Sequence, residues 1–168
     1  MLLNLTQRHG ILAICKTLGV SRSLVLQWIA RGILRPVRVG DSLGAVLGFS
    51  DMDLMAAAVS RELRRRHMPM PGVVAACQWI HAQTLESLQA AWAEGRTLLF
   101  IVGNGEPLSR LLSPDSIFNN PGVDLKAAAK AGVKVWAVDT EKAYTQLRDK
   151  LAANERKPKT ANEGAAVA

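Results

Sequence analysis

Apolar residues in the first third of the chain repeat at helical spacings and are interrupted by turn residues. Over residues 11–18 they are spaced like one face of a two-turn helix, and Gly19 follows where a left-handed residue ends a helix. Ser21 is placed to cap a second helix over residues 22–31, which stops at Gly32. Val25, Trp28 and Ile29 of this second helix lie at spacings of three and four and predict its inward face, with Leu24 beside it.

The pattern changes after Pro36 to an alternation of apolar and charged residues. The run VRV, the turn GDSLG and another apolar run predict a small β-hairpin over residues 37–47. Ser50 is placed to cap a third helix, which has carboxylates in its first turn and the basic sequence RELRRRH at its end. The segment MPMPG breaks this helix, and two more helices are predicted over residues 71–80 and 84–94.

The second half of the chain mixes strand and helix patterns. The segments TLLFIV and VKVWAVD predict strands, separated by a loop-rich region and a short Ala/Lys helix around residues 124–131. An amphipathic helix follows, and from Asn154 onward bulky apolar residues are almost absent. We therefore expect an α+β fold with three parts: an N-terminal unit over residues 1–83, a small α/β unit over residues 84–153 and a disordered tail over residues 154–168.

The charge of the chain is concentrated in its first part. The net charge of the 168 residues is +7. Residues 1–67 carry ten Lys or Arg against four Asp or Glu, a net charge of +6, and nine of those ten cations are Arg. Residues 68–150 carry eight of each sign. A concentrated basic surface attracts a polyanion through counterion release, and the planar fork of Arg suits phosphate groups. Nucleic acid is therefore the expected partner.

Other features narrow the class of protein. No apolar stretch approaches the length needed to cross a bilayer, so we expect no membrane partner. The beginning MLLNLTQRHG lacks the pattern of a secretory signal. Cys15 and Cys77 lie far apart and do not indicate a disulfide framework. We expect a cytoplasmic protein that is associated with the nucleoid when it binds DNA.

The order of the predicted elements in residues 11–47 is helix, tight turn, capped short helix and hairpin. The major groove of B-DNA admits one α-helix, which a crossing helix holds in place while a flanking ribbon reaches the backbone or the minor groove. This order therefore predicts a helix-turn-helix followed by a wing.

Residues 10–80 also resemble the winged helix-turn-helix domain of MerR-type regulators. The resemblance is carried by ILAICKTLGVSRSLVLQWIARGILRP and by FSDMDLMAAAVSRELRRRHMPMPG. The segment VSRSLVLQWIARGIL is similar to the excisionase-type helix-turn-helix as well. Positions that match the MerR-type pattern in register are Leu18, Gly19, Val20, Ser21, Trp28, Gly32, Leu34, Pro36, Phe49, Ser50, Asp53 and Leu54.

The resemblance implies that the second helix and the wing contact DNA. We expect Arg22, Ser23 and Gln27 to face bases or nearby phosphates, while Ser21 caps the reading helix. Leu26 stands where the family often has Arg. It either contacts a thymine methyl group or packs under the wing.

Further cations are expected to meet the DNA backbone. Arg31 and Arg35 follow the reading helix, and Arg38 on the wing is placed to reach the backbone or the minor groove. Arg61 and Arg65 at the end of the third helix either contact phosphate or form a solvated surface that the helix dipole favours.

Patterns for catalysis and cofactors are weak in this sequence. Cys77 and His81 lie four residues apart, but one pair cannot complete a tetrahedral metal site, and a structural role is expected. The GNG segment at residues 103–105 has neither the P-loop nor the dinucleotide-binding spacing and is typical of a turn. We therefore expect no enzyme, no metal and no cofactor.

The function expected from the sequence is sequence-specific binding of double-stranded DNA by a dimeric transcriptional regulator, most simply a repressor. Dimerisation through residues 84–153 would place two reading helices on two half-sites. Two alternatives remain open. One is an antitoxin or adaptor whose C-terminal unit binds a cognate protein, and the other is an excisionase-like protein that bends DNA.

Overall fold

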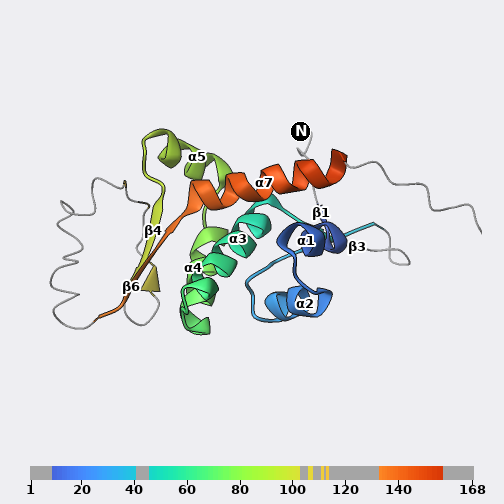
Figure 1. The fold of residues 1–168 in the computed structure, drawn as a ribbon, viewed down its shortest axis with the longest axis horizontal. Coiled ribbons are helices and arrows are strands. Elements are labelled where there is room, and N and C mark those ends of the chain that lie inside the picture. Colours follow the sequence, from blue (N-terminus) through green and yellow to red (C-terminus); the bar gives the residue numbers. More distant parts are fainter. Residues whose placement is uncertain are drawn as a thin grey trace, which may run out of the picture.

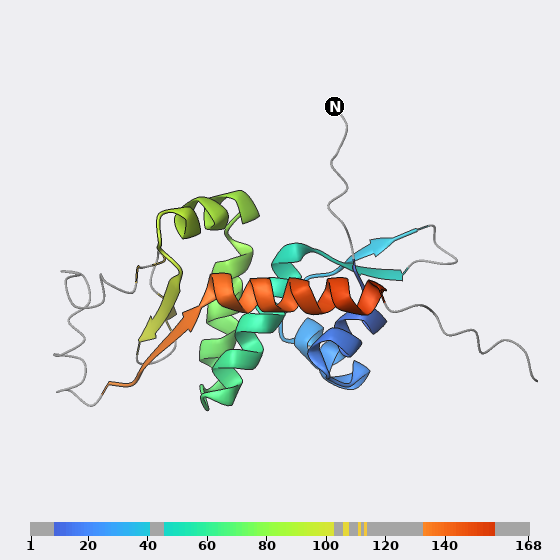
Figure 2. The same ribbon diagram turned by 45° about the horizontal axis from the view of Figure 1, so that its top comes forward.

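The computed structural model describes residues 9–40, 46–102, 106–107, 111, 113 and 133–156. In these residues the chain forms a mixed α+β fold with six helices and two small antiparallel sheets (Figure 1). The predicted α+β class is confirmed at this level. The two sheets lie at opposite ends of the molecule, and the helices lie between them (Figure 2).

The first two helices form where their caps predict them. Helix α1 (Ile11–Leu18) ends at Gly19, which adopts a left-handed conformation with φ of 63°. Helix α2 (Arg22–Ala30) begins after Ser21, whose Oγ accepts a hydrogen bond from the backbone N–H of Leu24 at 3.3 Å. Of the three residues predicted for its inward face, Val25 and Trp28 are buried and Ile29 is half-buried, as is Leu24 beside them.

The first sheet combines a hairpin with a short strand that precedes α1. Strand β3 (Val46–Phe49) pairs antiparallel with β2 (Val37–Val39) on one side and with β1 (His9–Gly10) on the other. The predicted hairpin is therefore formed by β2 and β3, with Val39 opposite Val46. Residues 41–45, which include most of the predicted turn, lie outside the described residues.

Three helices follow the hairpin. Helix α3 (Asp51–Arg65) starts with a capping box, in which Ser50 and Asp53 satisfy each other's backbone N–H groups. Helix α4 (Met70–His81) packs beside α3, and helix α5 (Leu85–Ala93) is capped by Thr84. These helices agree with the predicted ones to within one or two residues at each end.

The second sheet has the order β5-β4-β6. The central strand β4 (Leu98–Val102) pairs antiparallel with β6 (Val135–Asp139) over its full length and with the short strand β5 (Glu106–Pro107). The predicted turn at residues 103–105 and the predicted helix at residues 124–131 lie outside the described residues.

Helix α7 (Thr140–Arg156) leads back from this sheet across α3 and α1 (Figures 1 and 2). Leu147 and Leu151 of α7 are buried in the same core as Leu18 of α1. Near the end of α7, the Asn154 side-chain amide donates to Thr17 Oγ1 at 3.3 Å. Residues 154–156, which the sequence assigns to a disordered tail, are thus helical. The division of the chain at residue 83 stays a prediction.

Candidate nucleic-acid interface

Helix α2 presents a polar face to solvent. It is separated from α7 by α1, so the outer side of α2 is not covered by the C-terminal helix (Figure 1). The buried residues of α2 lie on one side and its exposed residues on the other, as in an amphipathic helix, and Trp28 on the inner side is only 4% exposed. The predicted contact residues of this segment are all exposed: Ser21, Arg22, Ser23, Leu26, Gln27 and Arg31.

Ser21 has a defined structural role at the start of this face. Its Oγ lies 3.3 Å from the backbone nitrogen of Leu24 and 2.8 Å from the Oγ of Ser23. The capping role predicted for Ser21 is confirmed. The cap holds the first turn of α2 together, and this turn carries Arg22 and Ser23.

Leu26 lies in the middle of the exposed face and is 46% exposed. It does not join the core that buries Val25 and Trp28. An exposed leucine among polar residues offers an apolar contact to a partner. Leu26 is therefore accessible at the surface of α2 and is not part of the packing beneath it.

The chain leaves α2 through a fixed connection. The backbone N–H of Arg35 donates to Asp53 Oδ1 at 2.5 Å, while the Arg35 side chain remains exposed. Because Asp53 also caps α3, this bond fixes the segment after α2 relative to α3. Arg35 is therefore held by its backbone, while its guanidinium group has no partner among the described residues.

The β2–β3 hairpin has two different faces. Arg38 is exposed and pairs across the strands with Leu47, so its side chain lies on the face that carries the buried Phe49. The opposite face of the hairpin carries three exposed valines, which are Val37 and Val39 on β2 and Val46 on β3. The predicted cation of the hairpin and this apolar row therefore point in opposite directions.

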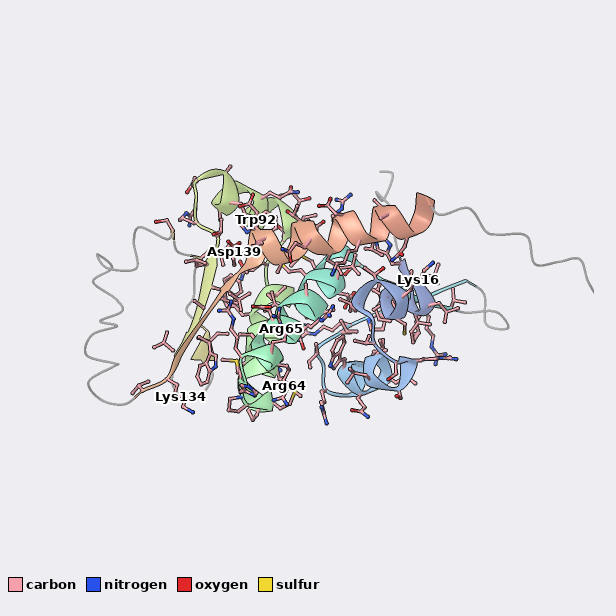
Figure 3. The ribbon with its side chains drawn as sticks, viewed as in Figure 1. Lys16, Arg64, Arg65, Trp92, Lys134 and Asp139 are labelled. Atoms are coloured by element: carbon pink, nitrogen blue, oxygen red, sulfur yellow. The ribbon has the colours of Figure 1, made fainter. Side chains whose placement is uncertain are left out.

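The structure places Arg61 and Arg65 apart from α2. Both are exposed on α3, and both line a cleft of about 430 Å³ whose walls come from α1, α3, β6 and α7. None of the residues that line this cleft belongs to α2. Figure 3 shows Arg65 on α3 and Asp139 at the junction of β6 and α7. The predicted site residues thus fall into two groups, one around α2 and the hairpin and one in the cleft.

Sequence reasoning missed several cations that the structure brings to these surfaces. Arg66, Lys142 and Lys150 join Arg61 and Arg65 around the cleft. The signal was present in the spacing, because Lys142 and Lys150 lie eight residues apart and so two turns apart on one face of α7. Without the tertiary structure, nothing connects that row of α7 with α3.

The turn between α3 and α4 also carries basic residues. Arg64 lies at the end of α3 nearest this turn (Figure 3), and its guanidinium donates to the carbonyl oxygen of Met68 at 2.7 Å. His67, predicted as a cation near the helix end, follows α3 with a left-handed φ of 59° and is exposed. Arg64 therefore closes the turn as well as adding charge to it.

The Cys77 and His81 pair serves the packing of α4. Burial raises the pKa of the Cys77 thiol to about 12, and the thiol donates to the carbonyl oxygen of Ala56 at 3.5 Å. His81 Nε2 lies 2.9 Å from the carbonyl oxygen of Ile33, which requires an Nε2–H donor. Each side chain thus has a partner on a different segment. No group of three or more His, Cys, Asp or Glu in the described residues could hold a metal ion.

Comparison of the sequence with protein families and curated proteins finds no match: no family model matches the chain, and no curated protein matches it by sequence. Among the helices that the structure describes, none is long and apolar enough to cross a membrane. The functional assignment therefore depends on the residues and geometry described above.

Proposed function

We propose that this chain is a cytoplasmic, sequence-specific DNA-binding protein of the MerR-like winged helix-turn-helix type, acting as a dimeric transcriptional regulator. The observation that carries the proposal is the exposed polar face of α2, which begins at the Ser21 cap. Helix α1 contacts both α2 and strand β3 of the hairpin. The concentration of Arg in residues 1–67 supports a polyanionic partner.

The dimensions of α2 suit the major groove. An α-helix with its side chains is about 10–12 Å across, and the groove is about 12 Å wide. The nine residues of α2 extend over about 13 Å along their axis. In this arrangement Arg22 can bind the O6 and N7 atoms of guanine with both arms of its fork. Gln27 can pair with adenine, and Leu26 can contact a thymine methyl group. Arg31, Arg35 and Arg38 then contact phosphates, which position the protein without reading sequence.

A single helix of this length contacts only a few base pairs. Specific binding therefore favours a symmetric dimer, with half-sites about 34–36 Å apart, one turn of DNA. The expected operator is a palindrome whose half-sites match the groove contacts of α2.

The experiment that tests the proposal selects DNA from a random pool with the pure full-length protein and then measures affinities by fluorescence anisotropy. Arg22→Ala should weaken binding to the selected site by about 1–3 kcal/mol and change the preferred base. Arg38→Ala should weaken binding to all DNA sequences alike. It should also reduce the dependence of the binding constant on salt concentration by about one phosphate contact. Lys134→Ala is the matched control, because Lys134 is an exposed cation that immediately precedes strand β6 of the distant second sheet.

Selection without an enriched motif contradicts the proposal and supports the antitoxin or adaptor hypothesis instead. If a motif is enriched but Arg22→Ala and Arg38→Ala bind it like Lys134→Ala, the proposed docking of α2 and the hairpin is wrong. A bending assay on the selected site distinguishes a simple regulator from an excisionase-like protein that bends its DNA.

A further inference from the structure

The cleft between α3 and α7 combines an apolar floor with a basic rim. Leu18 and Leu147 line it and are nearly fully buried, at 3% and 4% exposed. Five of its lining residues are Lys or Arg and two are carboxylates. Its volume of about 430 Å³ lies within the range of about 300–1,000 Å³ that is typical of small-molecule sites.

Both carboxylates of the cleft are already engaged within the protein. Glu62 accepts hydrogen bonds from Arg65 at 3.1 Å and from Arg66 at 3.0 Å. Asp139 Oδ1 accepts from the backbone N–H of Lys142 at 2.9 Å at the start of α7. The five cations of the lining outnumber these two carboxylates, so the cleft keeps a net charge of +3.

Three cations around the cleft have no partner among the described residues. Arg61 comes from α3, and Lys142 and Lys150 come from α7, so they approach the cleft from two walls. Unpaired cations on two sides of a concave, partly apolar site attract a compact anion. Arg61 supplies a planar fork, which matches the oxygen atoms of a phosphate group.

We propose that this cleft binds a small molecule that carries phosphate groups, of about the size of a mononucleotide. The phosphates contact Arg61, Lys142 and Lys150, and the uncharged part of the ligand packs on Leu18 and Leu147. The inference does not depend on the proposed DNA binding, because no residue of α2 or the hairpin lines the cleft.

The shape of the cleft separates this ligand from the DNA backbone, which offers the same phosphate chemistry. Duplex DNA is a long convex rod, whereas the cations here lie around a hollow whose volume suits one small molecule. Arg31 and Arg38, which are proposed to contact the DNA backbone, are exposed and do not line this cleft. A free phosphorylated molecule therefore fits the cleft better than a duplex does.

The test is isothermal titration of the full chain with inorganic pyrophosphate and with adenosine triphosphate. We expect saturable binding of one ligand per chain, weakened roughly ten-fold by Arg61→Gln and by Lys150→Gln, because each loses one charge-assisted contact. Lys134→Gln removes the same charge outside the cleft and should bind like the parent. Thermal midpoints verify that the three variants are folded, as expected for exposed side chains.

Two results would overturn the inference. One is the absence of saturable binding, or equal weakening by all three variants, which would mean only general attraction by a basic protein. The other is competition, in which duplex DNA displaces pyrophosphate and Arg61→Gln lowers DNA affinity more than Lys134→Gln does. That result would assign the cleft to the DNA backbone. The proposed role of α2 is tested separately by Arg22→Ala, so failure of one proposal leaves the other intact.

Discussion

Cys77 illustrates how burial changes the chemistry of a single residue. Its thiol is fully buried, and burial raises its pKa from 9.0 to about 12. A thiolate is the form that reacts and binds metals, so this cysteine is inert in the folded chain near neutral pH. The sequence places Cys77 and His81 on one helical face correctly, but their partners are 21 and 48 residues away and only tertiary packing shows them.

The raised pKa of Cys77 predicts a loss of stability at high pH. Between pH 9.0 and about 12 the thiol is ionised when unfolded and protonated when folded. The unfolded state then binds fewer protons, so the free energy of unfolding falls as pH rises, by up to about 1.4 kcal/mol per pH unit. From about pH 8 to about pH 10, we expect the parent chain to lose about 1.4 kcal/mol more than Cys77→Ala in urea unfolding.

Cys77→Ala leaves a small cavity, which lowers the free energy of unfolding by the same amount at both pH values. Comparing the change between the two pH values in the parent and in the variant therefore removes the effect of the cavity. Equal losses in the parent and the variant would mean that the thiol ionises within the fold, and the assignment of a high pKa would be wrong.

At the scale of elements, local sequence signals are sufficient to predict where the helices around the candidate interface begin and end. Gly19 ends α1, Ser21 caps α2 and Ser50 caps α3, and each of these roles depends on residues within a few positions in the chain. Capping chemistry is local, which is why the sequence alone predicts these boundaries. The angle and contacts between helices depend on distant residues, and they could not be predicted in the same way.

Asp53 shows the limit of that local reasoning. The sequence indicates a carboxylate that suits the helix dipole, but the structure gives it a second role between elements. Asp53 is 2% exposed and accepts hydrogen bonds from the backbone and side chain of Ser50 and from the backbone of Arg35. His81 Nε2 of α4 lies 3.9 Å from its Oδ1. One carboxylate thus connects the exit of α2 with α3 and α4.

Replacing Asp53 should therefore be costly. Asp53→Asn keeps the shape but turns one acceptor into a donor that faces the N–H of Ser50 or of Arg35. We expect the free energy of unfolding to fall by about 2–3 kcal/mol, the cost of a buried group whose partner is lost. Urea denaturation measures it.

Asp51→Asn is the matched control, because Asp51 lies two residues earlier in the same helix turn. Its side chain is 19% exposed, and its ion-pair contact is with His9 at 3.9 Å. Asp51→Asn should lower the free energy of unfolding by less than about 1 kcal/mol. Similar losses for the two variants would show that helix-dipole charge alone accounts for Asp53.

At the scale of the whole molecule, the return of α7 to the first helices determines both the cleft and the extent of the core. The sequence predicts α7 as an amphipathic helix but not the surface that it covers. Charge and order in the chain predict that Arg61 and Arg65 contact DNA together with the residues of α2. Their position in the cleft depends on α7, which lies about eighty residues further along.

The same packing predicts that the described chain unfolds as one unit. Buried apolar residues from both sides of residue 83 belong to one contiguous core, which includes Leu18 of α1 and Leu147 of α7. Leu147 is 4% exposed, so Leu147→Ala removes packing shared by α7 and its neighbours. We expect the free energy of unfolding to fall by about 2–5 kcal/mol. The single calorimetric transition, which includes the whole chain, should have a lower midpoint temperature.

Leu24→Ala offers a comparison within the N-terminal helices, where the side chain is only half-buried and the loss should be smaller. Two separate transitions, with Leu147→Ala lowering only one of them, would show that residues 1–83 and 84–153 fold independently. A single shifted transition would mean that α7 is part of the structural support of the N-terminal helices. A ligand in the cleft would then contact both the helix α1, which supports α2, and the helix that joins the two halves of the chain.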